Sequence, residues 1–152
     1  MYYFIIALVL VSDQIVKGLV TGGMAVGQSI PVIDKVFYLT YVQNTGAAFS
    51  NFEGQRLLLV AITSIMLAAL SFYLVKKRHS EHWTLLVALS LIIAGGVGNL
   101  IDRVRLGYVV DMFDFQFWPV FNIADIGVCV GCGFMILYIF ISGRENGKEK
   151  TV

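Results

Sequence analysis

Two uninterrupted apolar runs constrain the fold of this chain more than any other feature. Residues 57–75 and 83–101 each hold 19 residues without a charged side chain. As an α-helix, a run of this length spans about 28 Å, close to the hydrocarbon thickness of a bilayer. The composition agrees, because only 14% of the residues are charged, whereas a soluble domain carries about 25%. The chain is therefore predicted to be an integral membrane protein.

Two further apolar runs flank this pair. Residues 2–20 lack the positively charged start and the small-residue cleavage site of a signal peptide, so they are predicted to form a retained helix. Residues 121–142 follow a proline and form the last run. We expect one α-helical membrane domain, residues 1–152, with transmembrane helices at about 2–20, 57–75, 83–101 and 121–142 and a frayed tail.

The two longer connections carry signals of a small β-sheet. Within loop 21–56, residues 36–43 alternate in the manner of a strand. Within loop 102–120, residues 108–118 alternate well enough to form a second strand that pairs with the first. The segment 47–52 combines small residues with two phenylalanines, and we expect it to lie at the membrane surface, where aromatic rings are favoured.

Basic residues divide the ends of the predicted bundle into two sides. The loop 76–82 and the C-terminal tail carry Lys76, Lys77, Arg78, Arg144, Lys148 and Lys150. The two longer loops together carry fewer, spread over many more residues. The positive-inside rule then puts the short loop and both termini in the cytoplasm. Every aspartate falls on or near the outer side.

Small residues recur four positions apart in the last two apolar runs. The pairs are Ala94 with Gly98, and Gly127 with Gly131. Small residues let helix backbones approach closely in a membrane, so we expect these two helices to pack tightly with their neighbours.

Acidic residues near the fourth run suggest catalysis. Asp125 lies about one turn into this run, and Asp111 lies in the loop before it. Two carboxylates in a low-dielectric site cannot both ionise readily, so one can act as a general base on water and the other as a general acid. For Asp125, a helix-capping role beside Asn122 is equally compatible with the spacing. Asp102 and Asp114 are rivals of Asp111 for its role.

Two ion pairs are predicted from spacing alone. Asp13 and Lys17 stand four residues apart, on one face of the first helix. They form either a structural pair near the helix end or a brace for a nearby site. Asp102 is followed directly by Arg103, so an ion pair between these two is the simpler interpretation there.

Other chemistries lack the residues they need. His79 and His82 fall in the cytoplasmic loop, so no outer nucleophile has a histidine base, and no set of ligands fits zinc. We expect neither a metal nor a cofactor. Cys129 and Cys132 are interpreted as small buried thiols of a membrane helix. No basic stripe with interleaved aromatic residues indicates nucleic-acid binding.

Five segments of the chain together resemble the lipoprotein signal peptidase (signal peptidase II) family. The segments are Asp13–Lys17, Asn44–Ser50, Asn99–Arg103, Gly107–Asp111 and Phe121–Asp125. They occur in the order of the family's motifs and cover almost the whole chain. The resemblance implies an aspartic endopeptidase of the bacterial cytoplasmic membrane, with an extracytoplasmic sheet and a surface helix.

The resemblance also implies a substrate and roles for residues. The substrate class is the prolipoprotein with a diacylglyceryl cysteine, cut on the amino side of that cysteine, and globomycin-type cyclic peptides are the expected inhibitors. Asp111 and Asp125 match the catalytic pair, near the outer leaflet. Residues matching substrate-binding or supporting positions are Asn44, Gly46, Asn99, Asp102, Arg103, Asn122, Asp13 and Lys17. Membrane lipid is the expected surrounding partner, and a monomer the expected state.

One alternative comes from another functional class. A small proton-coupled transporter or channel subunit could use Asp13, Asp111 and Asp125 as relay groups. Such a protein favours charge or broken helices near the midplane of the membrane and repeats between its halves. The two central runs carry no charge, and the sequence shows no internal repeat, so the peptidase is the preferred interpretation.

Overall fold

The computed structural model describes residues 1–46 and 55–149. Its helices are α1 (Tyr2–Gly23), α2 (Arg56–Lys77), α3 (Trp83–Arg105) and α4 (Ile123–Glu149). Its strands are β1 (Ser29–Ile33), β2 (Phe37–Asn44) and β3 (Val109–Asp114). The segment 47–52, which we predicted to lie at the membrane surface, falls outside the described residues.

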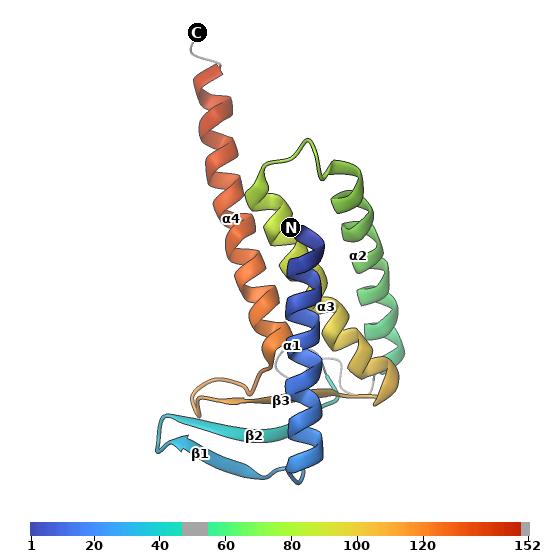
Figure 1. The fold of residues 1–152 in the computed structure, drawn as a ribbon, viewed down its shortest axis with the longest axis vertical. Helices are drawn as coiled ribbons and strands as arrows, with labels where there is room; N and C mark the ends of the chain where they lie inside the picture. The colour runs from blue at the N-terminus through green and yellow to red at the C-terminus, as the bar shows by residue number, and fades with distance from the viewer. Residues whose placement is uncertain (47–54, 150–152) are drawn as a thin grey trace.

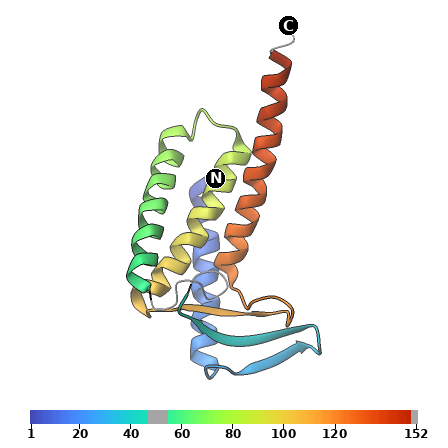
Figure 2. The ribbon, with the colours of Figure 1, turned by 180° about the vertical axis from the view of Figure 1, so that it is seen from behind.

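The four helices form a bundle with the sheet across one end (Figure 1). Each helix is long and apolar enough to cross a membrane. α3 is central, because 56% of its apolar window is buried inside the protein against 11–17% for the others. Both termini and the α2–α3 connection lie toward the end opposite the sheet, as the reverse view also shows (Figure 2). The predicted helical membrane fold with a small sheet is confirmed.

All four helices extend past the predicted ends of their apolar runs, α3 and α4 by the most residues. α3 continues to Arg105, so Asp102 and Arg103 are helical and the prediction that they begin a loop is wrong. The helix ends where Gly107 adopts φ +90° and donates its N–H to the Arg103 carbonyl, a conformation that glycine tolerates best. α4 is helical to Glu149, so the frayed tail predicted from Gly143 is also wrong over this part. Hydropathy marks where charge begins, whereas backbone hydrogen bonding decides where a helix ends.

The sheet is antiparallel in the order β1–β2–β3. β2 and β3 pair as predicted, with Val42 opposite Asp111. β3 is shorter than the strand that we predicted at residues 108–118. It ends at Asp114, because Asp114 accepts a hydrogen bond from the Gln116 N–H and Gln116 turns the chain at φ 64°. β1 was not predicted; Pro31 interrupts it and every one of its residues is exposed, as expected for an edge strand.

A small hydrophobic cluster seats the sheet against the first helix. Val20 of α1 packs with Tyr41 of β2 and with Val110 and Met112 of β3, and all four are buried. Because side chains alternate between the faces of a strand, burying Val110 and Met112 here turns Asp111 to the other face, toward the bundle. The packing of one face of β3 therefore orients its carboxylate.

The close packing predicted for the last two helices is confirmed. A Cβ added at Gly131 of α4 would lie 2.9 Å from the Ala88 carbonyl oxygen of α3. A Cβ at Gly95 of α3 would collide with the Ala124 carbonyl oxygen of α4. The absence of side chains therefore brings the start of α4, including Asp125, against α3.

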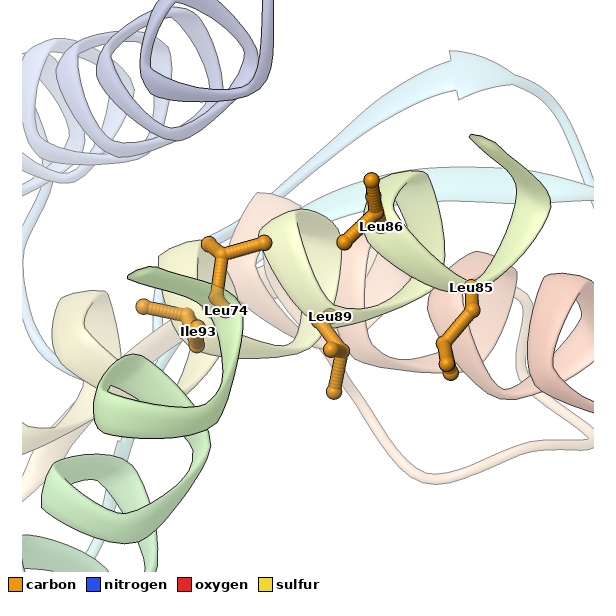
Figure 3. Packing of buried hydrophobic residues seen from close by; sticks show 5 residues of the cluster. All are labelled: Leu74, Leu85, Leu86, Leu89 and Ile93. Carbon is orange, nitrogen blue, oxygen red and sulfur yellow. The ribbon is translucent and has the colours of Figure 1, made fainter. Parts of the chain in front are cut away.

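A second hydrophobic cluster joins α2 to α3 at the end away from the sheet. Leu74 of α2 meets leucines and an isoleucine of α3, shown together in Figure 3: Leu85, Leu86, Leu89 and Ile93. This cluster holds α2 against the half of α3 that carries none of the candidate site residues.

Candidate active site

Asp125 is held at the start of α4 by a capping box. The Asn122 N–H donates to Asp125 Oδ2 at 3.1 Å, and the Asp125 N–H donates to Asn122 Oδ1 at 2.9 Å. Reciprocal bonds of this kind satisfy two backbone N–H groups that a helix start leaves free. The capping role predicted for Asp125 is thus confirmed. Its other oxygen, Oδ1, accepts a bond from Asn99 Nδ2 at 2.8 Å, so capping leaves the carboxylate attached to α3 as well.

Asp111 lies in the middle of β3 and is 2% exposed. Its Oδ2 accepts a hydrogen bond from Asn44 Nδ2 at 3.0 Å, and its Oδ1 accepts one from Asn122 Nδ2 at 2.6 Å. Burial raises the pKa of Asp111 from 3.8 to about 7; the negative charge of Asp125 also raises it, while the hydrogen bonds from the two asparagines oppose the rise. A carboxyl of this pKa exchanges its proton near neutral pH.

Asn122 joins the two acidic residues. Its backbone N–H bonds Asp125, and its side-chain amide bonds Asp111. Asn122 is completely buried, so these contacts are shielded from water and correspondingly strong. One asparagine therefore holds a carboxylate from the sheet beside a carboxylate from the helix bundle.

Both carboxylates face one cavity of about 400 Å³. Its lining includes both polar and apolar residues. The polar lining residues are Asn44, Asn99, Arg103, Asp111 and Asp125. The apolar ones are Val109, Trp118, Pro119, Val120, Phe121, Val128 and Cys129. A cavity of this size fits a few residues of a peptide and is within the range of ligand pockets.

Arg103 connects the cavity to the turn after β2. Its Nη2 donates to the Gly46 carbonyl at 2.8 Å. Gly46 in turn donates its N–H to Asn44 Oδ1 at 3.0 Å, which forms a turn directly after β2. The Nε of Arg103 is buried and has no hydrogen-bond partner among the described residues. This guanidinium is placed to donate to a carbonyl in the cavity.

The predicted pairing of Asp102 with Arg103 is wrong. Adjacent residues on a helix point in different directions, so Asp102 instead pairs with Lys17 at 2.9 Å, across the α1–α3 contact. The predicted pair between Asp13 and Lys17 is confirmed, also at 2.9 Å. These three charged side chains lie behind the cavity rather than in its wall.

Comparisons with known proteins identify the family. The family model described as "Signal peptidase (SPase) II" matches residues 5–141. The chain belongs to the signal peptidase II family. A lipoprotein signal peptidase of Halothermothrix orenii is 49% identical over 92% of this chain and 95% of the relative. One from Halalkalibacterium halodurans is 42% identical over 99% of each chain.

Two solved structures share the fold of this chain. Both are bacterial membrane enzymes determined by the in meso method. One has a TM-score of 0.87 and 33% identity, covering 93% of this chain and 88% of the other. The second has a TM-score of 0.81 and 34% identity, covering 91% of each chain. This signal peptidase II is therefore a bacterial membrane protease, which decides against the transporter alternative.

The structure gathers the residues proposed for the signal peptidase site in two layers. The wall of the cavity contains Asn44, Asn99, Arg103, Asp111 and Asp125. Asn122 and Gly46 touch this wall through hydrogen bonds, and Asp13, Lys17 and Asp102 form the layer behind. Asp114 lies outside, since its carboxylate bonds Thr40 and Gln116 at the far end of β3. Among the described residues, no cluster of histidine, cysteine, aspartate and glutamate could hold a metal ion.

Cys129 was missed by sequence analysis as part of the cavity lining. Cys129 lines the cavity one turn after Asp125, and both cysteines are exposed free thiols, so the expectation that they are buried is wrong. They lie on the outer face of α4, which the other helices leave uncovered. The i, i+4 spacing from Asp125 was the signal that could have placed Cys129 beside the site.

Proposed function

We propose that this signal peptidase II cleaves prolipoproteins on the amino side of a diacylglyceryl cysteine by an aspartic mechanism. The observation that carries the proposal is the joint placement of Asp111 and Asp125 on one cavity, linked through Asn122. The family assignment supplies the reaction, and the names of the relatives supply the substrate class.

The two carboxyl groups take opposite roles in this proposal. Asp125, as carboxylate, takes a proton from a water molecule that attacks the scissile carbonyl carbon. Asp111, whose pKa of about 7 lets it hold a proton near neutral pH, donates to the carbonyl oxygen as the tetrahedral intermediate forms. On collapse, the proton held by Asp125 passes to the departing amine of the lipid-modified cysteine, and the Asp111 carboxylate takes back a proton from a hydroxyl of the intermediate as the new carboxyl group forms. One water is consumed, and the pair returns to its starting protonation.

Neighbouring polar residues bind the substrate backbone. The unpartnered Nε of Arg103 donates to a substrate carbonyl, which would satisfy a buried donor that has no partner among the described residues. Asn44, the last residue of β2, holds Asp111 and lines the cavity. A globomycin-type cyclic peptide would compete by filling the same cavity.

The membrane orientation follows from charge. The end of the bundle with the termini and the α2–α3 connection carries most of the basic residues, so we propose that it is cytoplasmic. The sheet and the cavity then lie at the outer leaflet, where the cleavage point of a signal peptide emerges. The apolar wall ends on the uncovered face of α4, so acyl chains can stay in the lipid while the peptide enters the cavity. A single chain contains the whole site, and we propose that a monomer is sufficient.

The test is cleavage by the purified protein in lipid nanodiscs. A lipidated precursor should be cut before its cysteine, and the same precursor without diacylglycerol should be cut far more slowly. Asp111→Asn and Asp125→Asn should each abolish cleavage while accumulating in the membrane normally. Equal cleavage of the two precursors would disprove the proposed substrate, and retained cleavage in both variants would disprove the proposed pair.

Orientation is tested by labelling single cysteines in intact cells. In a Cys129→Ser, Cys132→Ser background, Val36→Cys beside the sheet should react with a membrane-impermeant maleimide. Ser80→Cys, in the α2–α3 connection, should react only after lysis. Both positions are exposed, so reversal of this pattern would reverse the proposed topology.

A further inference from the structure

Lys17 of α1 is buried at 3% exposure and does not line the cavity that holds the two acidic residues. Its ammonium group lies 2.9 Å from each of three oxygens: Asp13 Oδ2, Asp102 Oδ2 and Asn99 Oδ1. An ammonium group has three N–H donors, so all three are used. Lys17 is thus fully committed to these partners and acts on the cavity only through them.

The bond to Asn99 fixes the orientation of that side-chain amide. Asn99 Oδ1 accepts from Lys17 at 2.9 Å and from Asn122 Nδ2 at 3.1 Å. Its Nδ2 must therefore point the other way, where it donates to Asp125 Oδ1 at 2.8 Å. A flipped amide would place an NH₂ group against the ammonium and a carbonyl oxygen against the carboxylate, and both contacts would be repulsive.

The two carboxylates that bind Lys17 each hold a backbone N–H beside the site. Asp13 Oδ1 accepts the Ala124 N–H at 2.9 Å, and Asp102 Oδ2 accepts the Val110 N–H at 3.1 Å. Ala124 directly precedes Asp125, and Val110 directly precedes Asp111. The backbone on the amino side of each acidic residue is therefore attached to the same buried ion cluster.

We propose that Lys17 is a positioning residue for the reaction. It sets the hydrogen bond from Asn99 to Asp125 and, through Asp13 and Asp102, the relative placement of β3 and the start of α4. This inference rests on the proposed catalytic roles of Asp111 and Asp125.

The charge of Lys17 adds a second effect that can be measured separately. Lys17 lowers the pKa of Asp111, against the larger effect of burial. The charged groups near Lys17 come from three elements: Asp13 on its own helix, Asp102 and Arg105 on α3, and Asp125 on α4 beyond Asn99. Removing the ammonium group of Lys17 takes away a positive charge that favours the ionised form of Asp111, so the pKa of Asp111 should rise further.

The experiment compares Lys17→Met with a double variant that balances charge. Lys17→Met alone leaves two buried carboxylates without a counter-ion and can fail to accumulate for that reason. Lys17→Met combined with Asp102→Asn removes one charge of each sign and keeps an oxygen that accepts the Val110 N–H. Lys77→Met is the matched control, because Lys77 is an exposed lysine with only a 3.9 Å pair to Glu81.

The expected results separate positioning from a merely structural role. For the folded double variant, kcat should fall about a hundredfold with KM nearly unchanged. In Lys17→Met alone, which removes only the positive charge, the alkaline limb of the pH profile should move to higher pH. When Asn99→Ala is already present, adding Lys17→Met and Asp102→Asn should lower kcat much less, because the hydrogen bond from Asn99 to Asp125 that Lys17 orients has already been removed. Lys77→Met should match the wild type.

The outcome that overturns the inference is equally specific. If the double variant keeps wild-type kcat per folded molecule, Lys17 only stabilises the fold. If Lys17 and Asn99 act additively, Lys17 does not work through Asn99. The variants Asp111→Asn and Asp125→Asn are measured in parallel: if they retain cleavage, the proposed function fails, whereas if they are inactive and Lys17 is dispensable, this inference alone fails.

Discussion

Asn122 and Asp125 exchange hydrogen bonds between backbone and side chain at the first turn of α4, at 3.1 Å and 2.9 Å. The same asparagine donates its side-chain amide to Asp111 at 2.6 Å. The capping box that starts α4 therefore also links Asp111 of β3 to Asp125 of α4. The capping role of Asp125 is compatible with the catalytic role that we propose, because a carboxylate has two oxygens and capping occupies one of them.

Substituting Asn122 should separate these two roles. Asn122→Ala removes the cap and leaves buried partners unsatisfied, so the free energy of unfolding should fall by about 2 kcal/mol, and kcat by about a hundredfold. Asn122→Ser retains a capping oxygen but cannot donate to Asp111 in the same way. It should therefore recover part of the stability and little of the activity. Thermal unfolding in detergent and cleavage assays measure the two effects, and wild-type kcat in both variants would contradict the role of Asn122.

Asp114→Asn should retain most of the cleavage activity, unlike Asp111→Asn. The two residues lie three positions apart on β3, but the carboxylate of Asp114 bonds Thr40 and Gln116 and does not reach the cavity. Initial rates on a lipidated precursor, at equal amounts of folded enzyme, give the comparison. Loss of activity in Asp114→Asn with activity kept in Asp111→Asn would move the catalytic role to Asp114.

The cleavage rate should fall as pH rises through about 7. Asp111 must hold a proton to act as the acid, and its pKa is about 7 because burial and the charge of Asp125 disfavour ionisation. The measurement is kcat/KM against pH, with lipidated precursor in nanodiscs. A rate that rises steadily from about pH 6 to about pH 9 would show that Asp111 does not serve as a protonated acid.

Asp111→Asn should stabilise the protein at neutral and alkaline pH. The pKa of Asp111 is higher in the folded protein than the unperturbed 3.8, so the folded state binds more protons and wild-type stability falls as pH rises from about 4 to 7. Asparagine does not titrate, so the difference in melting temperature between variant and wild type should grow over that range and then level off. A difference independent of pH would mean that the pKa of Asp111 is not raised in the fold.

Gly131→Ala should destabilise the contact between α3 and α4. The new Cβ would lie 2.7 Å from an Ile92 carbon and 2.9 Å from the Ala88 carbonyl oxygen. The two helices must therefore separate, and the free energy of unfolding should fall by about 1–3 kcal/mol. Gly133→Ala is the control, because a Cβ added at Gly133 would have nothing within 4 Å. Thermal unfolding of both variants should show a loss only at Gly131; equal stability would mean that the helices adjust without strain.

Much of the fold was predictable because a membrane restricts the choices. An uncharged run of 19 residues has few alternatives to a spanning helix, and alternation in 36–43 identified β2 to within a residue at each end. The end of α3 was not predictable in the same way. Asp102 ends the apolar run, yet α3 continues past it, because Lys17 of α1, far away in the sequence, neutralises that carboxylate.

The sequence by itself determined the helical membrane fold and the residue types needed for an acid–base pair. Only the tertiary structure decided which aspartates line one cavity, which cation pairs with Asp102 and which apolar residues complete the lining. Asp102 and Asp114 have the same side chain as Asp111, and spacing along the chain does not distinguish them. The distinction arises because Asn44, Asn99 and Asn122 come from three separate segments and converge only when the sheet packs on the bundle. Hydrogen bonds over such separations depend on packing in three dimensions, which local sequence patterns do not encode.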